Sequence, residues 1–292
     1  MNPTRRAYFE LHIAVFLFGF TAILGKIISV PETVLVWWRV FFTVISLLFL
    51  IDVVKLYREL PKKTFFQFLA IGILVAIHWV TFFGAAKYAN VSICLVCMAT
   101  ASFFTALLEP LIMKQKVKWF ELGLGLLIIP GMMLVVKNTE SFMYIGIVMG
   151  LISAFLAALF STLNKKLIDE TSPLAITFLE IGGALLFLTL IMPAYLFFAP
   201  DVQIMPVGMD WVYLIVLALL CTTFAYVLSL RALQHITAFA ANLTVNLEPV
   251  YGIILAIVLL QENKELDSGF YLGVVVILGA IFVYPLLKRF YK

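Results

Sequence analysis

The feature that most limits how this chain can fold is a succession of apolar stretches, each about as long as a membrane-spanning helix. A helix that crosses the hydrocarbon core of a bilayer needs about 20 mostly apolar residues. Because the gaps between the stretches are too short for a folded soluble domain, any function has to lie among the helices. The sequence therefore predicts an all-α polytopic membrane protein with ten transmembrane helices, at 7–28, 32–51, 65–85, 91–113, 119–136, 142–163, 174–198, 211–230, 237–260 and 269–287.

The composition favours the same fold class. Hydrophobic residues make up 64% of the 292 residues and charged residues only 12%, whereas a soluble domain typically contains about 25% charged residues. A transmembrane β-barrel would instead show segments of about ten residues with alternating hydrophobicity. The first stretch is long and is not followed by the small-residue cleavage pattern of a secretory signal, so we interpret it as the first span.

The distribution of Lys and Arg predicts the orientation in the bilayer, because cytoplasmic loops are enriched in these residues. With the N-terminus inside, 15 of them fall on the cytoplasmic side, 4 fall outside and Arg39 lies within a span. Both termini are then cytoplasmic. The basic residues are scattered over loops and not gathered on one face, so the net charge of +4 does not indicate nucleic acid binding. The 15 are Arg5, Arg6, Lys55, Arg58, Lys62, Lys63, Lys114, Lys116, Lys118, Lys165, Lys166, Arg231, Lys288, Arg289 and Lys292; the 4 are Lys26, Lys87, Lys137 and Lys264.

The second half of the chain repeats the first. Residues 102–131 and 249–279 both contain an aliphatic helix, a polar turn and a helix with two glycines six residues apart, and Lys26 corresponds to Lys165. Each half, 7–137 and 142–287, has five spans. Since five is odd, the two halves must cross the membrane in opposite directions, an arrangement typical of secondary transporters.

One apparent part of this repeat is out of register. Glu109-Pro110 resembles Glu248-Pro249, but the alignment of the two halves places Ala101-Ser102 opposite Glu248-Pro249. We therefore interpret the likeness of the two Glu-Pro pairs as a coincidence.

Several segments carry a resemblance to a known family: "LEPVYGIILAIVLLQE" at 247–262, "GFYLGVVVILGAIFV" at 269–283, "FFTALLEPLIMKQKVKWFELGLGLLIIPGMML" at 103–134 and "TSPLAITFLE" at 171–180. In these segments the chain resembles the ten-helix, EamA-like members of the drug/metabolite transporter superfamily. The resemblance implies a carrier of five plus five inverted helices that moves small metabolites, often outward, in the bacterial inner membrane. We expect a monomer or homodimer without a cofactor.

Polar side chains within the spans are candidates for the site, because burying them in hydrocarbon is costly. Arg39 can bind a carboxylate or phosphate of the substrate; alternatively it reaches the outer interface or pairs with a structural acid. Glu180 is its counterpart in the second half, and is either a proton-coupling carboxylate or a packing residue. Because the inverted geometry puts Glu180 nearer the inner face, the two residues need not touch, and the sequence gives no basis for a salt bridge between them.

The span at 237–260 contains two asparagines on one helical face. Asn242 and Asn246 are four residues apart, and residues at this spacing lie above one another. They either line the translocation path or join helices by hydrogen bonds. Glu248 lies on the opposite side of this predicted helix, so we expect it to have a structural role.

His78 and Trp79 correspond to Ala225 and Tyr226 in the repeat. Trp79 and Tyr226 can form the walls of a cavity for a flat or apolar substrate, or can simply pack. His78 either titrates near neutral pH or is a buried histidine with satisfied hydrogen bonds. Asn164 with Ser161, and Thr21 in the matching part of the first span, are further polar candidates; Ser and Thr in membrane helices usually bond to their own backbone.

No pattern indicates an enzyme. The P-loop, H-E-x-x-H and G-x-S-x-G motifs are absent from the sequence, and Cys94 and Cys97 lack further ligands for a metal. The sequence predicts a secondary transporter, working as an exporter of small metabolites such as amino acids or related compounds, with a proton as a candidate coupling ion. The alternatives are a channel or scaffold without carrier activity, a membrane-embedded enzyme, or a carrier of nucleobases or sugar derivatives.

Overall fold

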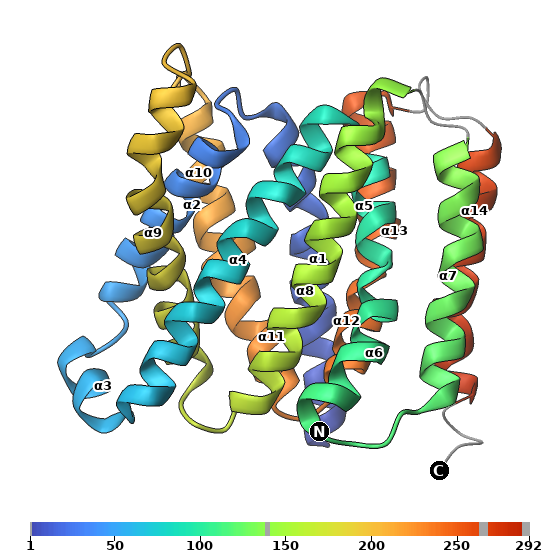
Figure 1. The fold of residues 1–292 in the computed structure, drawn as a ribbon, viewed down its shortest axis with the longest axis horizontal. Coiled ribbons are helices and arrows are strands. Elements are labelled where there is room, and N and C mark those ends of the chain that lie inside the picture. Colours follow the sequence, from blue (N-terminus) through green and yellow to red (C-terminus); the bar gives the residue numbers. More distant parts are fainter. Residues whose placement is uncertain (1, 138–140, 263–267, 288–292) are drawn as a thin grey trace.

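A computed structural model describes residues 2–137, 141–262 and 268–287, and these residues contain helices but no strands (Figure 1). Helices occupy all ten predicted positions. Seven helical segments are long and apolar enough to cross a bilayer, or eight if α2 and α3 count as one bent span, and α7 and α14 occupy the other two positions. The single helices are α1 (Pro3–Ile27), α2 (Glu32–Leu48), α3 (Val53–Glu59), α4 (Lys62–Tyr88), α7 (Trp119–Lys137), α9 (Pro173–Phe198) and α14 (Ser268–Leu287).

The remaining spans are composite. They consist of α5 (Val91–Ala99) with α6 (Ala101–Met113), and of the 3-10 turn η1 (Ser141–Met143) with α8 (Tyr144–Leu167). They also include α10 (Asp210–Ala218), the π-helix η2 (Leu219–Phe224) and α11 (Ala225–Leu233) in one span. The last comprises α12 (Ala238–Val245), α13 (Glu248–Leu255) and the π-helix η3 (Ala256–Leu260).

The short helix α3 was not expected from the sequence, which predicts a loop after the second span. α2 ends at Leu48, and the chain turns by 88° into α3. Asp52 begins α3 by accepting a hydrogen bond from the backbone N of Lys55 at 2.9 Å, a standard N-cap interaction. None of the residues of α3 is buried, so this helix lies at the end of the bundle and does not cross it (Figure 1).

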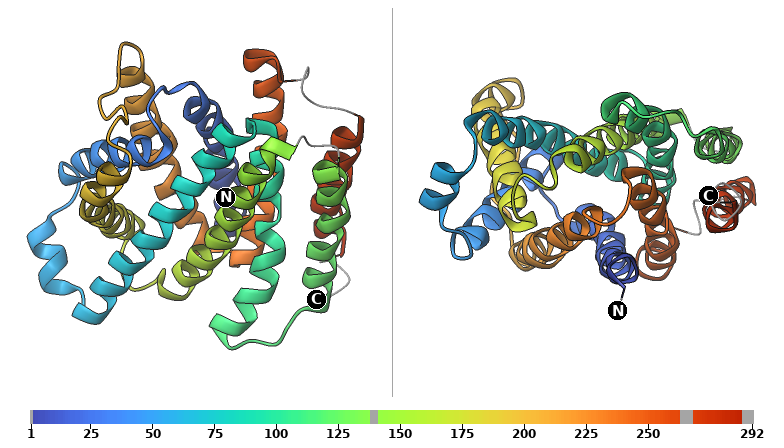
Figure 2. Two further views of the ribbon diagram at one scale, coloured as in Figure 1. Left: turned by 45° about the horizontal axis from the view of Figure 1, so that its top comes forward. Right: turned by 90° about the horizontal axis from the view of Figure 1, so that it is seen from below.

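The two halves are inverted relative to each other. α1 begins at one end of the bundle, and its counterpart α8 begins at the opposite end (Figure 1). The contacts repeat as well: α4 and α6 pack on α8, as α11 and α13 pack on α1, while α2 pairs with α9 and α7 with α14. Figure 2 shows the last pair side by side at the edge of the bundle. The predicted inverted repeat is therefore confirmed.

Corresponding spans also break at corresponding places. The span at 91–113 breaks at Thr100, and the span at 238–260 breaks at Asn246–Leu247. The side chain of Thr100 donates to the carbonyl of Cys97 at 2.7 Å, and Pro249 lacks the N–H that a continuous helix would use. This match supports the register that places Ala101-Ser102 opposite Glu248-Pro249.

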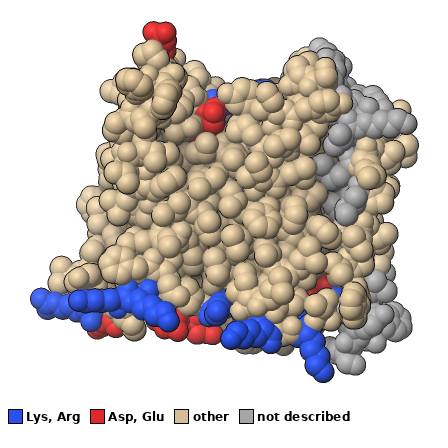
Figure 3. All heavy atoms as spheres, in the orientation of Figure 1, with Lys and Arg blue, Asp and Glu red and all other residues tan. Residues whose placement is uncertain are grey.

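The bundle has one strongly basic end. α1 begins there, α14 ends there and α3 lies there (Figure 1). On the face drawn in Figure 3, Lys and Arg gather at the same end and the wall of the bundle is free of charge. We call this the basic end, and the other the opposite end. Lys264, Lys288, Arg289 and Lys292 of the predicted charge pattern lie outside the described residues.

Close packing of α4 against α9 fixes the neighbourhood of Glu180. A Cβ atom on Gly72 would lie 2.1 Å from the carbonyl O of Glu180, and one on Gly183 would lie 2.4 Å from that of Leu69. Small residues let membrane helices approach closely where no hydrophobic force drives them together. Gly72 and Gly183 therefore determine how near α9 stands to the centre of the bundle.

Candidate functional site

A central cavity of about 120 Å³ lies among helices from both halves. Since one water molecule needs roughly 10–15 Å³ of such space, the cavity can hold a compact small molecule. Its apolar walls include Leu11, Phe18, Phe82, Met98, Phe160, Leu230 and Leu233. Its polar lining includes Thr21, Arg39, His78, Ser161, Asn164, Tyr226, Ser229, Asn242 and Glu248. Trp79 also lines the cavity and contacts both Arg39 and Tyr226.

Arg39 on α2 is the only Arg or Lys that lines this cavity, and its side chain is 1% exposed. Nε donates to Thr222 Oγ1 at 2.6 Å, and Nη2 donates to the carbonyl of Cys221 at 3.4 Å. Both partners belong to the π-helix η2, a deformation that is frequent at functional sites. No acid among the described residues lies within salt-bridge distance of Arg39. It therefore neither reaches the interface nor pairs with a structural acid, the two alternatives that the sequence left open.

Aromatic rings hold this guanidinium in place. The Arg39 Cζ atom lies 3.9 Å from the centroid of the Trp79 ring, a cation–π geometry. Trp79 in turn makes an edge contact with Tyr226, with ring centroids 6.2 Å apart. The two aromatic residues that correspond in the repeat thus meet across the cavity.

His78 has one satisfied nitrogen. Nδ1 lies 2.9 Å from the carbonyl O of Ser153, and since a carbonyl only accepts, we assign the proton to Nδ1. Ser153 Oγ also donates to the carbonyl of His78 at 3.0 Å. Nε2 of the neutral ring is then an acceptor available to the cavity that His78 lines.

Glu180 lies behind the cavity wall, where it holds two lining residues. Tyr226 Oη donates to Glu180 Oε2 at 2.6 Å, and Asn164 Nδ2 donates to the same oxygen at 3.2 Å. Among the described residues, Arg39 and Glu180 form no salt bridge with each other. Glu180 orients Asn164 and Tyr226 in the cavity.

The buried polar atoms without a hydrogen-bond partner cluster at this site. Among the described side chains they are Thr21 Oγ1, Arg39 Nη1, Asn164 Oδ1 and Glu180 Oε1; Thr21 has only the Cys221 thiol beside it, a weak partner. Buried polar groups are nearly always satisfied, and each exception calls for an explanation. Arg39, Thr21 and Asn164 line the cavity, so their unpartnered atoms indicate a place built for a polar ligand or ordered water, whereas Glu180 Oε1 lies behind the wall.

The predicted asparagine face is only half correct. Asn242 lines the cavity and donates to Thr105 Oγ1 at 2.7 Å, but Asn246 is not among the lining residues and donates to Ala99 O and Ser102 Oγ at 3.0 and 2.9 Å. Asn246 therefore joins the two broken spans to each other.

The expectation that Glu248 lies on the side opposite Asn242 is wrong, because both residues line the cavity. The expectation assumed one continuous helix, whereas the break at Asn246–Leu247 changes the helical phase. Glu248 and Arg39 both line this cavity but are not within salt-bridge distance of each other.

The cavity extends toward the basic end. Leu11, Leu230 and Leu233 line it near that end. The counterparts of Leu230 and Leu233 in the first half are Phe83 and Ala86. All four side chains are buried, but Phe83 and Ala86 are not among the residues that line the cavity. A Cβ atom on Gly25, the counterpart of Asn164, would lie 2.1 Å from the Phe83 ring. The opposite end is thus closed by direct packing.

Two lysines that correspond in the repeat make corresponding contacts. Lys26 Nζ donates to the carbonyls of Ala86 and Ala89 at 3.1 and 3.5 Å, at the end of α4. Lys165 Nζ donates to the carbonyl of Leu233 at 2.7 Å, at the end of α11. A cation at a helix C-terminus is favourable, so each lysine caps the helix that lines its own end of the cavity.

The sequence did not predict the structural roles of two carboxylates, those of Glu109 and Glu262. Glu109 accepts from the backbone N of Ala238 and Phe239 at 3.2 and 2.7 Å, at the start of α12. Glu262 accepts from the backbone N of Val91 and Ser92, both at 3.0 Å, at the start of α5. Glu109 therefore has the same role as Glu262 and not that of Glu248, because Glu109 and Glu262 each cap a helix of the other half. The likeness of Glu109-Pro110 to Glu248-Pro249 remains coincidental. The one signal in the sequence for these caps is that each of the two acids lies near the end of a predicted span.

No group of three or more His, Cys, Asp or Glu among the described residues could hold a metal ion. Cys94, Cys97 and Cys221 are free and buried. The site offers hydrogen bonds, one cation and two carboxylates, which are groups suited to binding a polar ligand.

Comparisons with known proteins agree with this geometry. The model of the EamA-like transporter family matches the chain twice, at residues 5–137 and 144–284. The "Uncharacterized transporter YetK" of Bacillus subtilis (strain 168) is 32% identical over 134 residues, which are 45% of this chain and 39% of that protein. The matched segment therefore spans well under half the length of this relative. A crystal structure of a protein with 15% identity shares the fold with a TM-score of 0.69 over 98% of both chains. The chain belongs to the EamA-like transporter family, within the drug/metabolite transporter superfamily.

Proposed function

We propose that this transporter is a secondary carrier that exports small metabolites bearing both an anionic group and a hydrogen-bond donor, with amino acids and related compounds as the first candidates. The observation that carries the proposal is the set of unpartnered buried atoms around one cavity. Arg39 Nη1 is a cationic donor suited to a carboxylate. Asn164 Oδ1, which belongs to a residue that lines the cavity, is an acceptor suited to an ammonium group.

The aromatic lining complements these polar groups. Trp79, Phe82 and Phe160 provide apolar surface for the remainder of the ligand. Ligand sites are typically apolar with a few well-placed polar groups. Flat nucleobases fit the same aromatic surface, so they form a second group of candidates in the test below.

The end toward which the cavity extends supports the proposed direction and orientation. Basic residues favour the cytoplasmic side, and the cavity extends toward the basic end. On this view the structure is an inward-facing state with both termini in the cytoplasm, ready to load substrate from inside. If the two inverted halves exchanged their packing, so that the basic end was sealed and the cavity extended toward the opposite end, the carrier would be in the outward-facing state.

The test is counterflow in proteoliposomes with purified protein and labelled amino acids and nucleobases. We expect saturable exchange of at least one amino acid. Arg39→Ala should lower the exchange about 100-fold, because truncating one partner of a buried charged contact costs about 2–5 kcal/mol. Val212→Ala on an exposed side of α10 is the matched control and should exchange normally.

Other outcomes point elsewhere. Linear, non-saturable flux would indicate a channel, and exchange of nucleobases alone would change the substrate class. Saturable exchange that survives Arg39→Ala would keep the carrier and reject this cavity as its site. Circular dichroism and size-exclusion profiles establish that the variant remains folded.

Proton coupling is proposed for the two carboxylates at the site. Glu248 faces the cavity without a hydrogen bond, and Glu180 has one free oxygen. Glu180→Gln and Glu248→Gln should be measured under an imposed pH gradient. If either carboxylate carries the coupling proton, its variant will retain counterflow and lose acceleration by the gradient. Acceleration that persists in both variants would reject these two residues as proton carriers.

A further inference from the structure

A second cavity lies at the basic end, outside the central site. It has a volume of about 290 Å³ and lies between the first turns of α1 and the end of α11. It shares no lining residue with the central cavity. The residues that line it are Pro3, Arg6, Ala7, Glu10, Arg231, Gln234 and His235.

Two arginines in this cavity share a single carboxylate. Glu10 Oε1 accepts from Arg6 Nε at 2.9 Å and lies 3.1 Å from Arg231 Nη2. The cluster therefore has a net formal charge of +1, with the imidazole of His235 beside it. The side chain of Glu10 is only 12% exposed, whereas those of Arg6 and Arg231 are 60% and 41% exposed. The carboxylate lies beneath two guanidinium groups that still present free N–H donors outward.

These donors suit a phosphate group. Guanidinium groups form paired hydrogen bonds with phosphate oxygens, and a second arginine from another helix allows the anion to be held from two sides. Neither Arg6 nor Arg231 makes a further hydrogen bond to the described residues. The cavity also has amide donors at Gln234.

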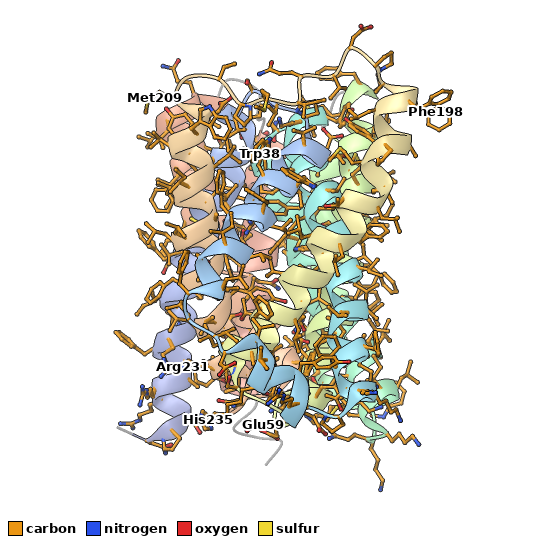
Figure 4. The ribbon with its side chains drawn as sticks, turned by 90° about the vertical axis from the view of Figure 1, so that its left-hand side faces the viewer. Trp38, Glu59, Phe198, Met209, Arg231 and His235 are labelled. Atoms are coloured by element: carbon orange, nitrogen blue, oxygen red, sulfur yellow. The ribbon has the colours of Figure 1, made fainter. Side chains whose placement is uncertain are left out.

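The position of the cavity favours a lipid as the source of the phosphate. Figure 4 shows Arg231 and His235 at the basic end, just beyond the apolar wall of the bundle. Phe9 lies on α1 within one turn of Arg6 and Glu10 and is 59% exposed. Basic pockets at the cytoplasmic ends of transmembrane helices are suited to anionic headgroups, and an exposed aromatic ring offers a surface for an acyl chain.

We propose that Arg6, Arg231 and His235 form a phosphate-binding site for the headgroup of an anionic phospholipid. Because Glu10 competes with the phosphate for both arginines, it limits the affinity of the site. The proposal does not depend on which substrate the central cavity transports.

The experiment uses the full chain in detergent and measures lipid binding by native mass spectrometry and by the shift of the melting temperature. The probes are phosphatidylglycerol, phosphatidylcholine and inorganic phosphate, each added separately. We expect phosphatidylglycerol to bind in preference to phosphatidylcholine. Arg231→Ala should weaken its binding about fivefold, and Glu10→Gln should strengthen it.

Arg58→Ala is the matched control, because Arg58 is an exposed arginine on α3 at the same end of the bundle. It should leave binding unchanged. Equal weakening by Arg58→Ala and Arg231→Ala, or weakening by Glu10→Gln, would overturn the proposal, since binding would then follow overall surface charge or folding. An Arg231-dependent shift with inorganic phosphate, but none with phosphatidylglycerol, would overturn the lipid as the source and assign the site to a soluble phosphate compound.

Discussion

The two ends of the central cavity are made from corresponding parts of the repeat, yet they are packed differently. Asn164 and Leu233 line the cavity at the basic end. Their counterparts Gly25 and Ala86 lie in the core at the opposite end, where Phe83 fills the space beside Gly25. Similar folds at the two ends therefore do not produce the same access. In this structure the cavity extends toward the basic end, and direct packing seals the opposite end.

Hydrogen bonds also join separate elements at the sealed end. Asp210 accepts from the backbone N of Ser29 at 3.2 Å and from its hydroxyl, joining the start of α10 to the α1–α2 connection. Lys87 donates to the carbonyls of Ile28 and Val30, and the indole of Trp38, seen near this end in Figure 4, donates to Ile204 O at 2.9 Å. An inversion of the carrier would have to break these contacts and form new ones at the basic end.

The largest difference is expected in chemical access. Cysteines at Leu233 and Ala86 can be compared after replacing the three buried native cysteines by alanine. Both side chains are buried, with exposed fractions of 4% for Leu233 and 0% for Ala86, but Leu233 lines the cavity and Ala86 does not. A water-soluble maleimide should therefore label Leu233→Cys faster than Ala86→Cys, because the latter reacts only after a local opening that costs a few kcal/mol. Equal labelling rates, followed by mass spectrometry on folded protein, would show that the two ends do not differ.

Gly25→Ala should loosen the sealed end. The new methyl group would lie 2.1 Å from the Phe83 ring, and overpacking of this kind typically costs about 1–3 kcal/mol. We expect faster labelling of Ala86→Cys in this variant and a lower melting temperature. Gly182→Ala is the control, since no atom lies within 4 Å of its added Cβ. Unchanged labelling at Ala86 would mean that Gly25 does not hold the seal.

The exchanged carboxylate caps offer a smaller and directly matched comparison. Glu262 accepts from two backbone N–H groups and from the Ser92 hydroxyl at 2.7 Å, whereas Glu109 accepts from two backbone N–H groups. Loss of a helix cap costs about 0.5–2 kcal/mol. Glu262→Gln should therefore lower the melting temperature more than Glu109→Gln. A larger decrease of the melting temperature in Glu109→Gln than in Glu262→Gln would contradict the expectation that the opposite end is held more tightly.

The smallest effect is expected from the lysine caps. Replacing Lys26 or Lys165 by methionine keeps the aliphatic stem and removes the charge near a helix C-terminus, an interaction worth about 0.3–1 kcal/mol. Both variants should melt slightly below the wild type and by similar amounts. A large difference between them would show that one lysine has a role beyond capping, and the counterflow assay would then be repeated with that variant.

Much of the fold could be predicted from the sequence because its causes are local. The length and apolarity of the stretches set the spans, and an odd number of spans in each half requires inversion. The correspondence of Lys26 with Lys165 also held, since both cap equivalent helices. The 88° turn into α3 was missed, because a short interfacial helix has no 20-residue apolar signal.

The candidate site was predictable in its residue types and less so in its geometry. Six of the eight predicted residues line the central cavity: Arg39, His78, Trp79, Asn164, Tyr226 and Asn242. Glu180 lies behind the wall, and Asn246 joins the broken spans. Polar residues are rare in hydrocarbon, so a sequence can reveal them. The sequence does not reveal the break in the helix at Asn246–Leu247. This break places Glu248 in the lining of the cavity and Asn246 outside it.

The sequence by itself determined an all-helical membrane protein, its repeat and the buried polar residues from which a site could be built. Only the tertiary structure decided which of these atoms meet. Arg39 docks on the π-helix η2 and on Trp79, both distant in sequence, and one of its N–H groups is left free. The end toward which the cavity extends was also decided there. Apolarity and loop charge act on each segment separately, whereas access depends on how Gly25 and Phe83 pack across the interface between helices.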